Sequence, residues 1–286
     1  MRTYKEVLED GIHLLDAAAI EEAGLDAWLL LEYAANINRA WYYAHMDEIL
    51  DKKTESRYLE MCAKRAQHIP LQHITGRAYF MGYEFCVDER VLVPRQDTEV
   101  LVETALTHLK DSRSPKILDM CTGSGCIIIS ILHNVEGVKG YAVDISKQAV
   151  NVAKENAKLN EVPVLFERSD LFEMVTEKFD VIVSNPPYIP TEVAKSLEVS
   201  RSEPFSALDG GADGLKFYRE IIKKSAAALP ADGVLALEIG FDQGESVKAL
   251  ALEYFRDAEV FRDYADNERV VICSFKDSAI KIGENV

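Results

Sequence analysis

The sequence predicts an α/β fold in which a doubly wound, mostly parallel sheet is covered by helices on both faces. From Asp97 onward, apolar runs of strand length alternate with amphipathic stretches of helical period. This alternation is typical of parallel strands joined by crossover helices. Residues 1 to about 70 show helical periodicity throughout and no strand pattern. A small amino-terminal helical bundle is therefore expected before the α/β domain.

Length and charge limit the possible functions. The chain has 286 residues, of which 48% are hydrophobic, and its formal net charge is −16. This length is enough for one large core and a smaller one. An acidic chain repels phosphate backbones, so no nucleic-acid partner is expected, whereas a basic protein would be attracted.

Cysteine usage and hydropathy indicate the compartment. No Cys-x-x-Cys pair and no zinc spacing is present among Cys62, Cys86, Cys121, Cys126 and Cys273. Reduced thiols and no metal site are therefore expected. No apolar stretch approaches the roughly 20 residues that would span a bilayer, and the amino terminus lacks a signal-peptide pattern. The sequence favours a cytoplasmic protein with no membrane partner.

The bundle is expected to span residues 1–73. Apolar side chains fall on one helical face over 7–15 and again over 28–37. A third helix is predicted from 54 to about 67, with Thr54 as its N-cap. The aromatic cluster at 41–43 fits either the bundle core or a surface for a partner, and the core is favoured.

A strand-like, turn-rich segment follows over residues 74–95. Gly76 and Gly82 interrupt it, which favours a β-hairpin. We expect this hairpin to link the bundle to the α/β domain, which then spans residues 96–286.

The elements of the α/β domain follow in chain order. Helices are expected at 97–110, 126–134, 146–160, 214–228 and 243–255. Strands are expected at 116–120, 138–143, 163–167, 179–184, 233–239, 258–262 and 269–275. Because no helix separates the last two strands, they are expected to pair antiparallel at one edge of the sheet.

A loop rich in hydrogen-bond acceptors follows the apolar strand at 179–184. Its sequence over 185–190 is Asn-Pro-Pro-Tyr-Ile-Pro. The prolines fix φ at about −65° and remove N–H donors, so the Asn185 side-chain oxygen and the loop carbonyls remain. These acceptors beside Tyr188 suit a planar –NH₂ group on an sp² carbon. The alternative is a proline-rich turn that merely ends the strand.

A glycine-containing turn follows the strand at 116–120. Gly123 and Gly125 would let backbone N–H groups and a helix amino terminus approach a ligand. Ligands of doubly wound sheets bind at the carboxyl ends of the strands. Taken alone, this pattern fits a plain tight turn nearly as well.

The ends of the next two strands also carry polar residues. Asp144 is placed to accept hydrogen bonds from both hydroxyls of a ribose. Ile128 stands where a dinucleotide fingerprint would have its third glycine, which favours an adenosine without a pyrophosphate. The Ser-Asp pair at 169–170 fits contact with an adenine and a helix cap equally well.

In order and spacing, these motifs resemble those of class I S-adenosylmethionine-dependent methyltransferases. The resemblance rests on 119–125, 142–146, 169–170 and 185–189. It implies a Rossmann-like, seven-stranded methyltransferase sheet. It also implies that S-adenosyl-L-methionine is bound by Asp119, Cys121, Thr122, Gly123, Ser124, Gly125, Asp144, Ile145, Asp170, Leu171, Phe172 and Asn185.

More narrowly, the chain resembles the release factor glutamine N5-methyltransferase family, the PrmC/HemK group, over nearly its whole length. The motifs that carry this resemblance lie at 70–76, 80–82, 91–99, 203–208, 214–218 and 238–240. The resemblance implies protein methylation in translation termination. The substrate would be the side-chain amide N5 of the glutamine in the Gly-Gly-Gln motif of class I peptide-chain release factors. The bundle would dock the release factor.

This chemistry requires mainly that a weakly nucleophilic amide nitrogen be placed before an activated methyl group. The Asn185 oxygen and the Pro186 carbonyl are expected to accept the two amide protons, while Tyr188 walls the flat amide. Pro187 completes the expected substrate site. Because the proton leaves after methyl transfer, no general base is needed.

Three other functions remain open from the sequence. An adenine-N6 methyltransferase of DNA or RNA would present the same amino group to the loop. A glutamine methyltransferase could act on a ribosomal protein instead. A non-catalytic module could bind S-adenosylmethionine and serve as a docking scaffold.

The chain departs from the family pattern at several positions. Cys121 stands where glycine is usual, Gln96 where proline is usual, and Leu171 where many members carry an aromatic residue. Stacking on the adenine would therefore be weaker or come from Phe172. For Arg95, Glu99 and Glu203, a structural role is favoured over a catalytic one.

Overall fold

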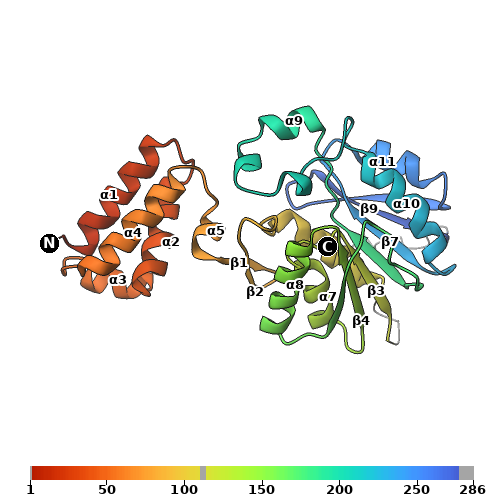
Figure 1. Ribbon diagram of the computed structural model, residues 1–286, viewed down its shortest axis with the longest axis horizontal. Coiled ribbons are helices and arrows are strands. Elements are labelled where there is room, and N and C mark those ends of the chain that lie inside the picture. The colour runs from red at the N-terminus through yellow and green to blue at the C-terminus, as the bar shows by residue number, and fades with distance from the viewer. Residues whose placement is uncertain (1, 110–113, 277–286) are drawn as a thin grey trace, which may run out of the picture. The chain divides into compact units, whose positions relative to one another are not determined.

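The computed structural model describes residues 2–109 and 114–276. The chain divides into two compact units, Met1–Arg77 and Ala78–Val286 (Figure 1). Residues 110–113 and 277–286 of the expected α/β domain lie outside the described ranges, as does the last residue of the helix expected at 97–110.

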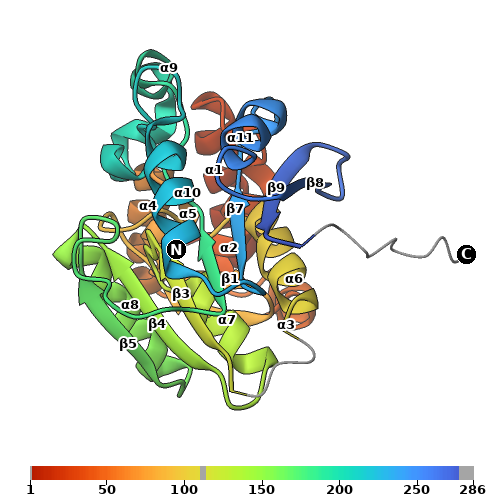
Figure 2. The ribbon, with the colours of Figure 1, turned by 90° about the vertical axis from the view of Figure 1, so that its right-hand side faces the viewer.

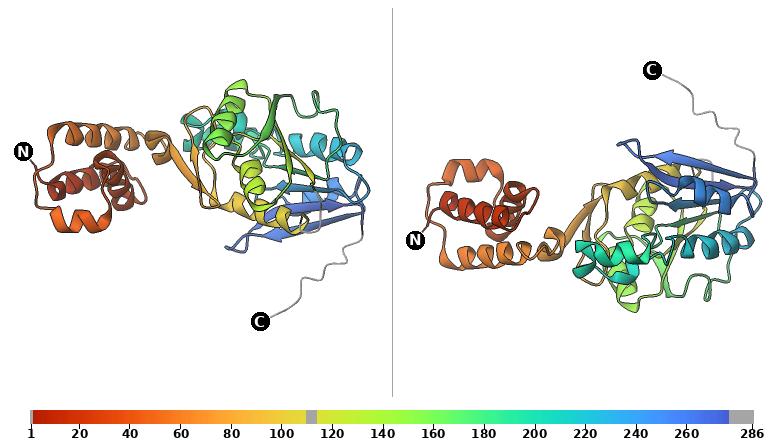
Figure 3. Two further views of the ribbon diagram at one scale, coloured as in Figure 1. Left: turned by 90° about the horizontal axis from the view of Figure 1, so that it is seen from below. Right: turned by 90° about the horizontal axis from the view of Figure 1, so that it is seen from above.

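The smaller unit is helical, as the sequence predicts, and Figure 3 shows it in two views. Its helices are α1 (Tyr4–Ala17), α2 (Ala23–Ala35), α3 (Arg39–His45), α4 (Lys52–Arg65) and α5 (Leu71–Thr75). Helices α1, α2 and α4 pack against one another. Leu30, Leu31 and Tyr58 are fully buried between them, so the unit has a hydrophobic core of its own.

The N-cap predicted for the helix near residue 54 is wrong by three residues. The carboxylate of Asp51 accepts hydrogen bonds from the N–H groups of Lys53 and Thr54, each at 3.0 Å. Thr54 therefore lies in the first turn of α4. Asp and Thr are both good caps, and the helix begins at the earlier of the two.

The aromatic cluster at 41–43 is divided between core and surface. Tyr42 is buried, and its ring meets that of Trp28 edge to face with centroids 5.2 Å apart. Tyr43 is 68% exposed. Successive helical side chains are about 100° apart, so one short helix cannot bury all three.

The predicted hairpin is formed by β1 (Arg77–Phe80) and β2 (Tyr83–Cys86), which make a two-stranded sheet. Phe80 and Phe85 are fully buried in the core of the larger unit. The hairpin thus contributes to that core, and its role as a linker over 74–95 stays a prediction.

The larger unit contains a seven-stranded sheet in the order β5-β4-β3-β6-β7-β9-β8 (Figure 2). Its strands are β3 (Lys116–Met120), β4 (Lys139–Asp144), β5 (Val164–Arg168), β6 (Val181–Ser184), β7 (Val234–Glu238), β8 (Asp257–Arg262) and β9 (Glu268–Ser274). Neighbours among β3 to β7 are parallel. Strand β9 pairs antiparallel with β7 and β8, which confirms the predicted antiparallel edge.

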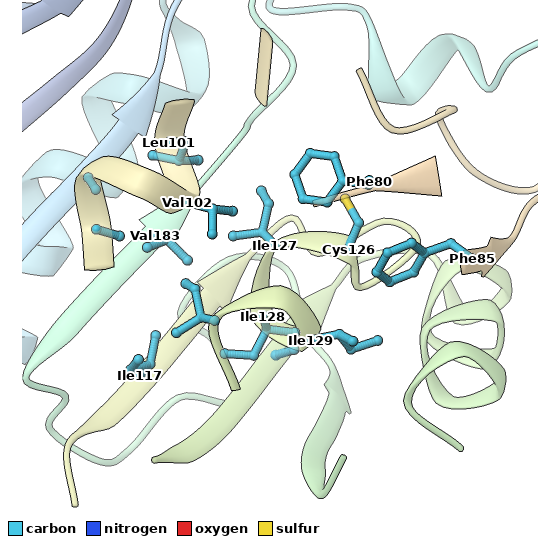
Figure 4. Packing of buried hydrophobic residues seen from close by; sticks show 14 of the residues in the cluster. Phe80, Phe85, Leu101, Val102, Ile117, Cys126, Ile127, Ile128, Ile129 and Val183 are labelled. Atoms are coloured by element: carbon cyan, nitrogen blue, oxygen red, sulfur yellow. The ribbon is translucent and has the colours of Figure 1, made fainter. Parts of the chain in front are cut away.

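Helices cover both faces of this sheet. The described helices are α6 (Glu99–Thr107), α7 (Cys126–Asn134), α8 (Lys147–Leu159), α10 (Lys216–Ala228) and α11 (Gly244–Ala251). Leu101 of α6 and Ile127 of α7 pack in one cluster with the hairpin residues Phe80 and Phe85 (Figure 4). Residues of α10 and α11 form a second cluster with other sheet residues. The doubly wound prediction is therefore confirmed.

The segment between β6 and α10 contains elements that the sequence did not predict. They are α9 (Thr191–Ser196) and the 3₁₀ helices η2 (Glu198–Arg201) and η3 (Phe205–Ala207). Another 3₁₀ helix, η1 (Gln96–Thr98), precedes α6. Elements this short do not repeat a helical period, so periodicity cannot reveal them.

The strand order places a ligand site at one position of the sheet. Strands β4 and β5 lie on one side of β3, and β6 and β7 lie on the other. Chain direction across the sheet therefore reverses between β3 and β6. Ligands of open α/β sheets bind outside the carboxyl ends of the strands at such a point.

None of the helices in the described ranges has the length and apolar character that a membrane crossing needs. The same ranges contain no group of His, Cys, Asp or Glu side chains that could hold a metal ion.

Candidate functional site

A cavity of about 530 Å³ lies at the carboxyl ends of β3, β4 and β6. This volume falls within the range of small-molecule sites. Of the residues predicted for the site, the cavity is lined by Cys121, Thr122, Gly123, Ser124, Asp144, Ile145, Asp170, Leu171, Asn185 and Pro187. The remaining predicted residues do not line the cavity: Asp119, Gly125, Phe172, Pro186 and Tyr188.

Asp119, in β3, is buried beneath the turn that follows this strand and is hydrogen-bonded to it. Its side chain is fully buried, and its Oδ2 accepts a hydrogen bond from the Thr122 hydroxyl at 2.6 Å. Burial raises the pKa of Asp119 to about 7. Its Oδ1 has no hydrogen-bond partner among the described residues. Hydrogen bonding to the Thr122 side chain and to the Ile128 backbone opposes this upward shift of the pKa, and Asp119 does not itself line the cavity.

The backbone of this turn is shaped for close approach. Gly123 has φ +56°, and a Cβ atom there would meet nothing within 4 Å, so open space faces it. Gly125 has φ +81°, and a Cβ atom there would come within 3.1 Å of the Cβ of Ala153. The first glycine leaves room for a ligand, while the second lets α7 begin close to α8.

Asp144 ends β4 and is held in place by backbone donors. Its Oδ2 accepts from the N–H of Gly123 at 3.0 Å, and its Oδ1 accepts from the N–H of Ser146 at 2.8 Å. Burial raises its pKa, and these two hydrogen bonds oppose the shift. Each carboxylate oxygen retains a second lone pair, so the group can still accept two hydroxyl hydrogens.

The turn after β5 directs Leu171 into the cavity. Ser169 is buried; its hydroxyl donates to the Leu171 carbonyl at 2.7 Å and accepts from the Met174 N–H at 3.0 Å. Leu171 has φ +47°, which reverses the chain. Phe172 consequently packs against the second core cluster rather than lining the cavity. The side chain of Leu171 makes the wall at this position aliphatic, and Ser169 and Asp170 line the cavity beside it.

The Asn185 side chain lies between the cavity and the protein interior. Its Nδ2 donates to the Thr98 hydroxyl oxygen at 3.2 Å. Among the described residues, no donor is bonded to the Asn185 Oδ1 or to the Pro186 carbonyl. The Asn185 Oδ1 therefore remains available as an acceptor at the cavity, whereas Pro186 does not line the cavity and the role expected for its carbonyl stays a prediction.

The rest of the Asn-Pro-Pro-Tyr loop is fixed by contacts from distant parts of the chain. The Gln243 Nε2 donates to the Tyr188 carbonyl at 3.0 Å. A Cβ atom at Gly210 would lie 2.7 Å from the Tyr188 backbone, and one at Gly214 would lie 2.4 Å from its carbonyl oxygen. Tyr188 itself is partly buried against the second core cluster. Only glycine permits this close approach.

Glu203 connects two segments of the cavity wall. Its side chain is fully buried; one carboxylate oxygen accepts from the Val93 N–H at 2.9 Å, and the other from Arg95 at 2.6 Å. Glu99 similarly accepts from the Met81 N–H at 2.6 Å. Both carboxylates thus have internal partners, which supports the structural roles favoured for them.

The sequence did not single out several residues that support the site. They are Thr98, which lines the cavity beside Asn185, Glu238 next to both, Asn156 beneath the glycine turn, and Gln243 beside Tyr188; Thr98 and Glu238 lie within the family motifs, but no role was expected for them. One signal was available for Glu238. It is a carboxylate at the end of an otherwise apolar strand, as Asp144 is.

Comparison with known proteins assigns the family. Residues 6–76 match the model for the PrmC N-terminal domain, and residues 96–201 match the model for the methyltransferase small domain. A release factor glutamine methyltransferase of Moorella thermoacetica is 40% identical over 273 residues, covering 93% of this chain and 96% of that protein. This chain belongs to the release factor glutamine methyltransferase family. A family member from Clostridium botulinum is 38% identical and covers 93% of this chain and 97% of its own length.

A solved structure agrees on the fold of this family member. The 16S rRNA methyltransferase RsmC of T. thermophilus, in complex with AdoMet and guanosine, has a TM-score of 0.50 at 17% identity. The match covers 70% of this chain and 50% of that one. At this identity the likeness supports the methyltransferase fold alone.

The family departure at position 121 has a structural consequence. Cys121 has φ +62°, in the left-handed region that favours glycine. The family member described here therefore carries a strained residue at the cavity wall.

Proposed function

We propose that this methyltransferase transfers a methyl group from S-adenosyl-L-methionine to the side-chain amide N5 of the glutamine in the Gly-Gly-Gln motif of class I peptide-chain release factors. Family membership over more than nine-tenths of the chain supports the substrate class. The observation that carries the chemistry is the Asn185 amide, whose oxygen is unpaired and whose side chain lines the cavity. The enzyme is a protein-(glutamine-N5) methyltransferase of translation termination.

The residues at the cavity fit S-adenosylmethionine. The volume suits a ligand of this size, Gly123 faces open space, and the Asp144 carboxylate lines the cavity. Asp144 would accept the ribose hydroxyls, and Ile145 and Leu171 would pack against the adenine. When bound, the cofactor supplies a methyl group on a positively charged sulfur, which leaves as a neutral thioether.

Asp144 provides a test of this assignment. Replacing Asp144 with alanine removes the acceptor for the ribose and the two backbone contacts that shape the turn. We expect the dissociation constant for S-adenosylmethionine to rise by roughly 10–100-fold, as for lost hydrogen bonds to a charged group. Isothermal titration calorimetry measures this change directly.

Asp180 offers a matched control. It also accepts a backbone N–H, that of Lys116 at 2.8 Å, where β3 and β6 begin rather than end. Asp180→Ala should leave cofactor affinity unchanged. Equal losses in the two variants would mean that Asp144 acts only through general stability.

The catalytic work that remains for the chain is placement. The glutamine nitrogen shares its lone pair with its own carbonyl and is a weak nucleophile. The Asn185 oxygen and the Pro186 carbonyl would accept its two hydrogens and hold the lone pair in line with the methyl carbon. Alignment of this kind contributes about 7–11 kcal/mol in well-oriented systems. Acceptors facing a nitrogen that becomes positive also stabilise the transition state more than the ground state.

The remaining assignments concern partners. The helical unit, which matches the PrmC N-terminal domain, is assigned to docking of the release factor body. The acidic chain disfavours nucleic acid as a substrate and favours a basic protein surface. A release factor substrate places the enzyme in the cytoplasm.

Mass spectrometry of the Gly-Gly-Gln peptide tests the proposal. Purified protein is incubated with S-adenosylmethionine and a class I release factor, and in parallel with DNA, with RNA and with ribosomal proteins. We expect a gain of one methyl group on the release factor glutamine and none in the other reactions. Transfer to nucleic acid or to a ribosomal protein alone would contradict the proposed substrate, and cofactor binding without any transfer would indicate a scaffold.

A further inference from the structure

A buried carboxyl group lies behind Asn185. Ser184, the last residue of β6, pairs in register with Leu237 of β7, so Asn185 and Glu238 occupy the next position on adjacent parallel strands. Glu238 is 2% exposed, and its Oε2 has no hydrogen-bond partner among the described residues. No step of the proposed methyl transfer uses this group.

Thr98 adjoins both the Asn185 amide and this carboxyl group. Thr98 is buried, and its hydroxyl oxygen accepts the hydrogen bond from the Asn185 Nδ2. A hydroxyl that accepts through its oxygen still has one hydrogen to donate. The Glu238 carboxylate is the adjacent acceptor: both Thr98 and Asn185 lower its pKa by hydrogen bonding.

An ionised carboxylate can only accept hydrogen bonds, whereas an asparagine amide has a donor end and an acceptor end. A carboxylate behind Thr98 and Asn185 therefore favours the orientation in which the amide nitrogen faces inward. The oxygen must then face the cavity. In the reversed orientation, the Asn185 –NH₂ group would face the –NH₂ group of the substrate, and two donors would meet.

We propose that Thr98 and Glu238 are positioning residues that lock the Asn185 amide with its nitrogen inward and its oxygen toward the substrate. This inference rests on the role proposed for Asn185. It adds that the orientation of the acceptor is set by a relay from Asn185 through Thr98 to Glu238, joining β6, η1 and β7.

The charge state of Glu238 depends on its surroundings. Burial raises its pKa to about 7, while hydrogen bonding to Thr98 and the positive charge of Arg269 oppose the shift. The other titratable groups that act on it or feel its charge are Asp97, Cys126, Tyr188 and Tyr218. The relay is strongest when Glu238 is ionised, above about pH 7.

Substitution at Thr98 tests the relay. Thr98→Val keeps the shape of the side chain but removes its hydroxyl, so we expect kcat to fall by roughly 10–100-fold. Thr98→Ser keeps the hydroxyl and should restore most of this loss. Thr104→Val, the same change at another buried threonine, removes only a bond to the Val100 carbonyl within α6 and should leave kcat unchanged.

Substitution at Glu238 adds a readout that a structural role would not change. Glu238→Gln introduces an N–H donor at this position, so the Asn185 amide can also take the orientation with its oxygen inward. We therefore expect kcat at pH 8 to fall by roughly 10–100-fold, as for Thr98→Val. In the wild type, kcat at saturating cofactor and release factor should fall as the pH drops through about 7, because the carboxyl gains a proton. Glu238→Gln should lose this pH dependence, and Thr104→Val should keep it. Calorimetric affinity for S-adenosylmethionine should be unchanged in all four variants.

The outcomes separate this inference from the proposed function. If Asn185→Ala is inactive while Thr98→Val and Glu238→Gln keep wild-type kcat, the relay is wrong and the role of Asn185 stands. If Thr98→Ser is as impaired as Thr98→Val, or Glu238→Gln retains the wild-type pH profile, the relay is also wrong. If Asn185→Ala is fully active, the proposed mechanism fails first.

Discussion

Asn185→Ala is expected to lower kcat for release factor methylation by about 10²–10³-fold, the range seen when one aligned polar group is removed from an active site. The affinity for S-adenosylmethionine should change little, because the turn after β3 and Asp144 make the principal polar contacts assigned to the cofactor. Single-turnover methyl transfer gives the first quantity and calorimetry gives the second. Measuring the two effects separately is necessary because the sequence assigns Asn185 to both the substrate site and the cofactor site.

Asn134→Ala is the matched control for this prediction. The Asn134 Nδ2 donates to the Ser130 carbonyl at 2.8 Å in the last turn of α7, and the residue does not line the cavity. Asn134→Ala should have the same kcat and the same affinity for S-adenosylmethionine as the wild type. If Asn185→Ala retained wild-type turnover, the acceptor role of the loop would be excluded.

Asn156→Leu is expected to reduce the free energy of unfolding by about 2–4 kcal/mol, since one buried and two partly buried backbone groups would lose their partners. The Asn156 Oδ1 accepts from the Cys86 N–H at 2.7 Å. Its Nδ2 donates to the carbonyls of Cys86 at 3.0 Å and Ser124 at 2.9 Å. This fully buried amide ties the β1–β2 hairpin to the glycine turn through α8. Cofactor affinity should fall as well, because Ser124 lies in the cavity wall.

Asn151→Leu makes the same chemical change at an exposed position of the same helix. Surface substitutions of this kind usually lie within about 0.5 kcal/mol of the wild type. Urea denaturation followed by fluorescence compares the two variants. Equal stability of Asn156→Leu and Asn151→Leu would show that the three hydrogen bonds of Asn156 contribute nothing net.

Strand positions in the larger unit were predictable because each strand is a short apolar run ending in a polar or glycine-containing turn. β3 and β6 are buried on both faces, so their apolar runs stand out from the amphipathic helices around them. The same argument located the ligand site. Asp144 ends β4 and Asn185 follows β6, the two strands that flank β3, and the carboxyl ends of parallel strands lie at one edge of the sheet.

Two details could not be predicted because neighbouring residues in the sequence are equally suited to the same role. Thr54 and Asp51 are both good N-caps, and only the start of α4 decides between them. Leu171 and Phe172 are neighbours, and the left-handed backbone at Leu171 decides which of the two lines the cavity. Local sequence does not determine which cap or which side chain is used, because tertiary contacts with the rest of the fold make one arrangement more stable than the other.

The sequence by itself determined the fold class, the order of the strands along the chain and two of the loops that line the cavity, because periodicity and turn residues act over short distances. Only the tertiary structure decided which groups stand behind those loops. Thr98, Asn185 and Glu238 are separated by dozens of residues, yet they meet because β6 and β7 are paired and the Asn185 amide is hydrogen-bonded to Thr98, the last residue of η1. The direction in which an asparagine amide points depends on the donors and acceptors around it, and these come from parts of the chain that no local pattern connects.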